Sequence, residues 1–168
     1  NNQSHQDSFN FYNNLAEMCT SYAQEAGKIS PLLVEESIIH EFKASFRTPY
    51  PDFPEPKVNF QGQREFIHEK QSFSSKKQLQ SHLENIAVKT IASFLNTRGG
   101  TLVIGVHEKS NIKNIIGIER EGFESHDHYE RHVIQKLNNS FGAVIVSKYI
   151  STEITKVNSI PVCVVSCK

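Results

Sequence analysis

The most constraining feature of the sequence is a long helical pattern that ends at two glycines and leads directly into an apolar run. Positions 83, 86, 87, 90, 91, 94 and 95 follow the i, i+3, i+4, i+7 spacing of an amphipathic helix. Ser81 and Glu84 have the spacing of a capping box, which predicts a helix start near residue 81. Gly99 and Gly100 predict its end, because glycine tolerates the left-handed conformation at a helix terminus. Residues 101–106 are continuously apolar, as in a strand buried on both faces.

Other segments have the spacing of a strand or a helix. Residues 38–46 alternate, which predicts a strand with Glu41 and Lys43 side by side on its polar face. Residues 127–139 predict a second helix. The remaining apolar runs predict strands at residues 112–118 (forming a hairpin with 101–106), 143–150, 152–157 and 160–167, the last two joined by a turn at Asn158 and Ser159. Together these elements predict a single compact α/β lobe of mixed α+β type, with helices packed on a mixed sheet.

The ends of the chain and one internal segment differ from this lobe. Residues 1–30 predict an N-terminal extension with a helix at 8–27, and residues 31–168 predict the domain. Four prolines in its segment 47–75 predict an irregular, Pro-rich insert. Because the chain stops inside an apolar run, we expect it to be a fragment of a longer protein.

Charge and motif content exclude several classes of protein. Lys plus Arg number 18 and Asp plus Glu number 18, so the net charge is zero and a polycationic tail is excluded. No apolar run approaches the ~20 residues of a membrane helix. The P-loop, the dinucleotide fingerprint, paired-cysteine zinc motifs and the serine-hydrolase elbow are all absent from the sequence. Cys19, Cys163 and Cys167 form no cluster, and no signal peptide is evident, which favours a reducing, cytoplasmic location.

Three blocks carry most of the functional information. They are ESIIHEFK at residues 36–43, KTIASFLNTRGG at residues 89–100, and TLVIGVHE at residues 101–108 followed by Ile-Gly-Ile at 116–118. In this order they resemble the Schlafen family, in particular the AlbA-type Schlafen domain. The resemblance runs from Glu36 to about Ile118 and more loosely to Lys168. It implies a nucleic-acid-binding α/β domain. In some family members this domain is a divalent-metal-dependent endoribonuclease that cuts structured RNA such as tRNA.

The resemblance also implies a set of site residues. Glu36, Glu41 and Glu108 correspond to the three acids that hold the metal in the nuclease members, although Glu108 stands where the family usually has Asp. These residues would be both the catalytic set and the ligands of Mg²⁺ or Mn²⁺, with no zinc expected. Carboxylate oxygens suit such ions, and a metal ion neutralises charge during phosphodiester cleavage. Strict alternation would place Glu36 and Glu41 on opposite faces, so we expect Glu36 in a turn before the strand.

Basic residues supply candidate phosphate contacts. Residues 61–100 contain six basic and three acidic side chains, the clearest positive excess in the chain. The predicted nucleic-acid contacts are Lys43, Lys76, Lys77, Lys89 and Arg98. Each has an ordinary structural alternative. Glu41 and Lys43 suit a solvated ion pair, Lys89 a polar helix face, and Arg98 the negative end of a helix dipole.

We therefore expect a Schlafen-like endoribonuclease domain that favours RNA over DNA and forms a homodimer, with two lobes around an RNA helix. One alternative is a non-catalytic DNA- or RNA-binding module of a bacterial regulator or defence protein. Another is a nucleotide-binding or interaction domain.

Overall fold

The computed structural model describes residues 39–109 and 112–168. The described residues all belong to one compact unit of the chain. The predicted helix at 8–27, Cys19 and Glu36 lie outside the described residues.

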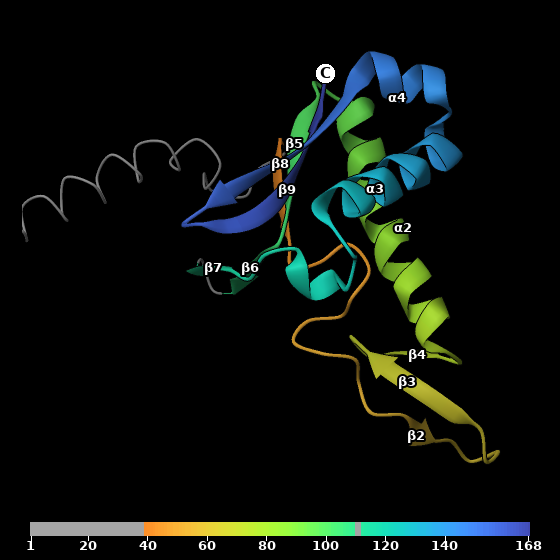
Figure 1. Ribbon diagram of the computed structural model, residues 1–168. Helices are drawn as coiled ribbons and strands as arrows, with labels where there is room; N and C mark the ends of the chain where they lie inside the picture. Colours follow the sequence, from red (N-terminus) through yellow and green to blue (C-terminus); the bar gives the residue numbers. More distant parts are fainter. Residues whose placement is uncertain (1–38, 110–111) are drawn as a thin grey trace, which may run out of the picture. The chain divides into compact units, whose positions relative to one another are not determined.

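A four-stranded mixed sheet organises the domain, in the order β1-β5-β9-β8 (Figure 1). Its strands are β1 (His40–Lys43), β5 (Gly100–Ile104), β8 (Ile150–Val157) and β9 (Ile160–Cys167). β1 runs parallel to β5, whereas β9 is antiparallel to both of its neighbours. Asn158 and Ser159 both have positive φ, 49° and 65°, and form the tight turn predicted between β8 and β9.

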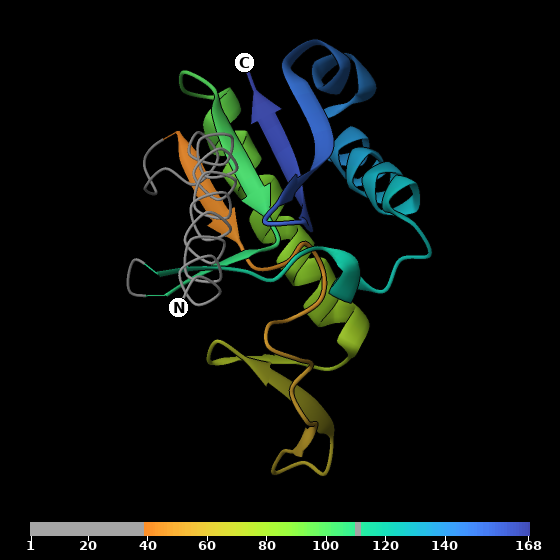
Figure 2. The ribbon, with the colours of Figure 1, turned by 60° about the vertical axis from the view of Figure 1, so that its left-hand side comes forward.

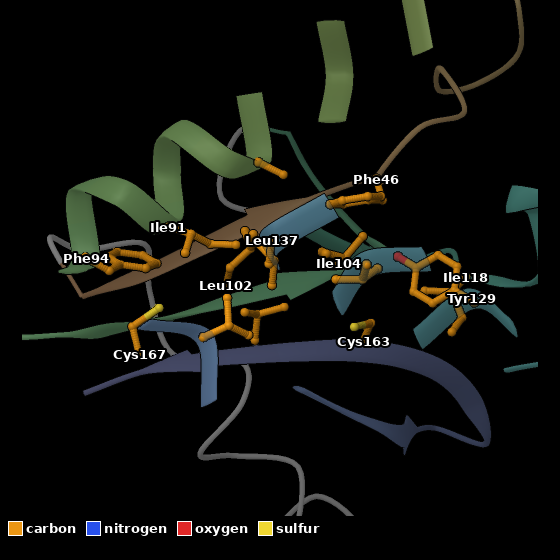
Figure 3. Packing of buried hydrophobic residues seen from close by; sticks show 14 residues of the cluster. Phe46, Ile91, Phe94, Leu102, Ile104, Ile118, Tyr129, Leu137, Cys163 and Cys167 are labelled. Carbon is orange, nitrogen blue, oxygen red and sulfur yellow. The ribbon is translucent and has the colours of Figure 1, made fainter. Parts of the chain in front are cut away.

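Two long helices cover one face of this sheet, as both ribbon views show (Figure 2). They are α2 (Lys76–Leu95) and α3 (His126–Phe141). Side chains from both helices meet the sheet in one buried cluster (Figure 3). Its members include Phe46, Ala87, Ile91, Phe94, Leu102, Ile104, Tyr129, Val133, Leu137, Cys163 and Cys167. The mixed α/β class predicted from the sequence is confirmed, and both C-terminal cysteines are buried.

The predicted hairpin between residues 101–106 and 112–118 is wrong in its pairing. β5 stops at Ile104, and a separate strand, β6 (Val106–Lys109), pairs with β7 (Ile112–Ile115). Gly105 makes the break: its φ is +102°, its N–H donates to Lys43 O at 2.8 Å, and its carbonyl accepts Gly117 N at 2.9 Å. The chain therefore passes from one sheet to another within a single apolar run. Gly105 permits this turn, because a side chain at position 105 would contact the backbone of Gly117.

The irregular insert predicted at residues 47–75 is wrong in its second half. Three short strands form a separate antiparallel sheet, which we call the wing (residues 57–73). Its strands are β2 (Lys57–Val58), β3 (Arg64–His68) and β4 (Gln71–Phe73). All the prolines of the segment precede the wing, so the ladder keeps its donors. The wing lies at the end of α2 where that helix begins (Figures 1 and 2).

Two further boundaries differ from the predictions. α2 begins at Lys76 and not near Ser81, because the Ser75 side chain caps it by accepting the N–H of Gln78 at 3.2 Å. Residues 143–150, predicted as a strand, form instead the helix α4 (Ala143–Tyr149). The four β-branched residues in the predicted run 143–150 favoured a strand, but tertiary context overrides such propensities. Within the described residues, no helix has both the length and the apolar character needed to cross a membrane.

Candidate nucleic-acid site at the edge strand β1

β1 lies at one end of the four-stranded sheet and presents Glu41 and Lys43 on one face. The register pairs Glu41 with Leu102 and Lys43 with Ile104, and both partners belong to the core beneath the helices. Side chains paired in a parallel register point to the same face, so Glu41 and Lys43 lie at the edge of the helix-covered face. They form an ion pair and are about 30% exposed. The prediction that these two residues lie side by side is confirmed.

A cleft of about 140 Å³ opens beside Lys43, and we call it the β1 cleft. It is lined by Lys43, Ala44, Ser45, Tyr50, His68, Glu69, Leu83 and Ile86. These residues come from the edge strand and the loop after it, from the β3–β4 turn of the wing, and from α2. The cleft therefore combines a cation, a phenol ring and an imidazole in a space open to solvent.

Tyr50 is held by two neighbours that the sequence did not connect with it. Its ring lies 4.5 Å from the His107 ring, centroid to centroid, and the Arg120 guanidinium carbon lies 5.2 Å from its centroid. Arg120 also donates to Pro49 O at 3.1 Å and to Pro51 O. These contacts fix the first part of the Pro-rich segment against β6 and the short 3₁₀ helix η1 (Glu119–Glu121).

Glu121 anchors the chain just after β1. Its carboxylate accepts the backbone N–H groups of Phe46, Arg47 and Thr48, the last two at 3.1 and 2.8 Å. Among the described residues, Glu121 is the one charged residue that is buried, with 6% of its surface exposed. Burial raises the pKa of Glu121, and the three backbone donors oppose that rise. The anchor sets the position of the loop that forms one wall of the β1 cleft.

Glu108 does not join Glu41. It lies in β6 opposite Lys113, and Glu108 Oε2 is 3.9 Å from Lys113 Nζ. Lys113 Nζ is 4.8 Å from the centroid of the Phe42 ring, and Phe42 pairs with Val103 on the face opposite Glu41. Glu41 and Glu108 therefore lie on different sides of β1, each with its own lysine.

Glu108 differs from Glu41 in that one of its carboxylate oxygens is buried without a hydrogen bond. Glu108 Oε2 is buried and has no hydrogen-bond partner in the part of the chain that the structure describes. Throughout residues 39–109 and 112–168, no three His, Cys, Asp or Glu side chains gather closely enough to hold one ion. Because Glu36 lies outside these residues, the shared metal site of Glu36, Glu41 and Glu108 stays a prediction.

The predicted phosphate contacts fall into two groups. Lys76 and Lys77 are exposed at the start of α2, about 10 Å along the helix axis before Leu83, which lines the β1 cleft. Lys43 lines the cleft itself. Lys89 is exposed further along α2, and Arg98 precedes β5 at the end opposite Gly105. Arg98 is thus separated from Glu108 by the length of β5, about 16 Å.

Sequence reasoning missed Tyr50, His68 and Glu69 as members of a cleft. They lie in the segment predicted to be irregular, where no periodicity indicated a partner. The Glu69-Lys70 pair carried one usable signal, because two polar residues between apolar alternations favour a tight turn. Both have positive φ, 47° and 66°, and form the β3–β4 turn.

A comparison with protein-family models matches residues 62–168 to the family described as Schlafen, AlbA_2. The matched region is well over half of the chain. The chain belongs to the Schlafen AlbA_2 family. The match contains Lys76, Lys77, Lys89, Arg98 and Glu108, whereas Glu36, Glu41 and Lys43 precede it. No curated protein and no solved structure matches the chain. Membership of the Schlafen AlbA_2 family supports a role in nucleic-acid binding, which agrees with the basic residues at the wing end of the domain.

Proposed function

We propose that this Schlafen AlbA_2 domain binds RNA along a surface that runs from the start of α2 into the β1 cleft. The observation that carries the proposal is that Lys43 lines a cleft with Leu83 and Ile86 of α2, the helix that begins with Lys76 and Lys77, although 33 positions separate Lys43 from Lys76. Each of these lysines can contact a phosphate group, and Tyr50 offers a ring beside Lys43.

The start of α2 is electrostatically unusual, which supports phosphate binding there. No acidic residue occupies the first turn, and two lysines add to the positive end of the helix dipole. Lys76 Nζ lies 5.0 Å from the centroid of the Phe53 ring, so its side chain is already oriented. Such an arrangement costs helix stability, and an anionic partner would offset that cost.

Binding of labelled RNA to the Lys76→Ala/Lys77→Ala double variant tests the proposal. Two lost phosphate contacts should weaken affinity about tenfold near 100 mM salt and lower the slope of log K against log salt by about 1.5. Lys156→Ala, which removes an exposed lysine from β8, is the control and should bind as the parent does. Equal affinities for parent, double variant and control would refute the proposed surface. The Lys89→Ala/Arg98→Ala variant then shows whether the site extends along α2.

Metal-dependent endoribonuclease activity is the second candidate, and one observation favours it: the buried Glu108 Oε2 without a hydrogen-bond partner. Mg²⁺ or Mn²⁺ bound there would neutralise charge on a phosphodiester. Within residues 39–109 and 112–168 this is the one buried carboxylate oxygen without a hydrogen bond, and a metal ion there would have to displace Lys113 Nζ, which lies 3.9 Å away. Glu41 is engaged with Lys43 on the other side of β1.

Two readouts separate cleavage from binding alone. If Glu108 holds a metal ion, Mn²⁺ should raise the melting temperature of the protein and Glu108→Gln should abolish that shift. Cleavage of tRNA should then require Mn²⁺ and be lost in both Glu41→Gln and Glu108→Gln. If the parent protein binds tRNA without cleaving it, and Mn²⁺ does not change its melting temperature, the domain is a non-catalytic binding module.

We also propose a homodimer that offers two such surfaces to one RNA helix. Light scattering of the protein with and without a duplex RNA measures its mass. A protein that stays monomeric under both conditions contradicts this part of the proposal.

A further inference from the structure

The turn between β2 and β3 holds an aromatic ring entirely in water. Phe60, at this turn, is fully exposed, at 113% of the reference area of a Phe residue. Neighbouring apolar side chains on the wing are also exposed, Val58 at 68% and Ile67 at 41%. An exposed aromatic ring at the tip of the wing does not contribute to the hydrophobic core, so contact with a binding partner is one reason for its presence there.

The backbone of this turn is rigid. Asn59 N donates to Gln63 O at 2.9 Å, and Gly62 N donates to Asn59 O at 3.0 Å. The Asn59 side-chain oxygen accepts the N–H groups of Gln61 and Gln63 at 3.0 and 2.9 Å. Four hydrogen bonds within five residues restrain the backbone that carries Phe60, so little backbone entropy remains to be lost when the ring meets a partner.

Glu65 ties the turn to the rest of the wing. It accepts hydrogen bonds from Asn59 Nδ2 at 2.5 Å and from Ser72 Oγ at 2.6 Å, one on each carboxylate oxygen. These bonds, the one from Ser72 first, lower the pKa of Glu65. The Glu65 carboxylate is therefore engaged in hydrogen bonds within the wing.

The wing and the start of α2 are positively charged. Residues 57–77 contain five basic side chains and two acids, a balance of +3, in a chain whose net charge is zero. The basic residues are Lys57, Arg64, Lys70, Lys76 and Lys77. α2 begins next to β4, and the β2–β3 turn lies at the end of the wing away from that helix (Figures 1 and 2). Lys57 and Arg64 lie on the two strands that flank the turn, so the exposed ring stands between cation-bearing strands, a combination that suits binding of unpaired bases.

We propose that Phe60 stacks on an unpaired base of a single-stranded nucleic acid whose phosphates follow Arg64, Lys76 and Lys77. The inference rests on the proposed function and deepens it, because it specifies a single-stranded segment and a stacking residue. β3 spans about 17 Å between the β2–β3 turn and the β3–β4 turn beside the β1 cleft, which is the length of about three nucleotides. One strand thus reaches both the ring and Lys43.

The chain contains no tryptophan, so Phe60→Trp introduces a single tryptophan at the wing tip, whose emission can be excited selectively. Its emission is followed while oligo(U), oligo(dT) and a duplex of equal length are added, and anisotropy of labelled oligonucleotide reports binding independently. Stacking should quench the emission with both single strands and much less with the duplex. Val144→Trp places an equally new fluorophore on α4, where the native side chain is 77% exposed, and its emission should stay unchanged.

Affinity gives a second readout. Phe60→Ala should weaken single-strand binding about tenfold, and Phe60→Leu should weaken it by nearly as much, because leucine keeps the apolar contact and loses the aromatic face. Oligonucleotide binding that is tight by anisotropy, with unchanged Trp emission and parental affinity in Phe60→Ala, would overturn the stacking and leave the proposed function intact. That result would indicate that the Phe60 ring contacts a protein partner instead of a nucleobase. Quenching by the duplex as strong as by single strands would overturn the unpaired base. No binding by anisotropy at low salt would overturn the proposed function itself.

Discussion

The carboxylate of Glu121 accepts the backbone N–H of Thr48 at 2.8 Å and so joins two residues that are 73 positions apart. The same carboxylate accepts the N–H groups of Phe46 and Arg47. We expect Glu121→Gln to lower the free energy of unfolding by about 2–3 kcal/mol, because an amide nitrogen cannot accept and a buried donor is left unsatisfied. Urea unfolding measures the loss. Glu119→Gln, on the exposed side of η1, should change the free energy of unfolding by less than about 0.5 kcal/mol. A loss in Glu119→Gln as large as that in Glu121→Gln would show that the hydrogen bonds of Glu121 are not the cause.

Glycine positions provide a matched pair of stability tests. Gly99 has φ +83°, and a Cβ atom there would lie 2.4 Å from the carbonyl oxygen of Cys167. Gly62 has φ +78° with nothing within 4 Å of a Cβ. Gly62→Ala should therefore cost about 1–2 kcal/mol for the backbone conformation alone. Gly99→Ala should cost roughly 2 kcal/mol more, because β9 must move as well. Equal losses in thermal unfolding would show that the close approach to Cys167 is tolerated.

Alkaline pH should destabilise the domain through a buried thiol. Burial raises the pKa of Cys163 to about 12, whereas a thiol in the unfolded chain ionises near pH 8.5. The folded state thus keeps a proton that the unfolded state loses, so the contribution is complete below about pH 8.5 and declines as pH rises toward 12. Between pH 8.5 and 10 the decline is about 1.6 kcal/mol.

Free energies of unfolding at a series of pH values measure this slope. Cys163→Ala is less stable at neutral pH because it leaves a cavity, but its stability should fall less steeply above pH 8.5. Parallel curves for parent and variant would mean that the thiol does not titrate on unfolding.

Substitution of Glu41 and substitution of Lys43 should change RNA affinity in opposite directions. Glu41→Gln removes a negative charge beside Lys43 and releases its ammonium group, so RNA should bind about two- to fivefold more tightly at low salt. Lys43→Ala should weaken binding by about fivefold. Both are measured by anisotropy at two salt concentrations, since screening should shrink the effects together. Weaker binding by both variants would mean that the ion pair acts as one rigid element.

The sequence predicted those elements whose signals were local and long. α3 follows a sustained apolar periodicity and a Ser125 cap, and the β8–β9 turn has the two small polar residues that positive φ favours. α2 was predicted with the wrong start because Ser81 and Glu84 match a capping box inside the helix. Glu84 instead binds His132 at 2.9 Å and Lys136 at 3.1 Å, and these partners on α3 are invisible to local reasoning.

The site was less accessible to sequence reasoning than the fold. Alternation correctly placed Glu41 beside Lys43, because a strand fixes which neighbours share a face. It gave no information on which side of β1 Glu108 would lie, because Gly105 redirects the chain between β5 and β6. The wing was missed because its strands are two, five and three residues long, too short for a periodic signal.

The Glu121 anchor also bears on how the edge strand is aligned. β1 has four residues and one neighbouring strand in the described sheet, so few ladder bonds oppose a shift along β5. A slip of one position would exchange Glu41 with Phe42 and turn a charged edge into an aromatic one. By holding the three residues from Phe46 onward, Glu121 penalises that slip. A random mutagenesis screen scored for lost nucleic-acid binding should therefore recover substitutions at Glu121, a carboxylate that itself faces no ligand.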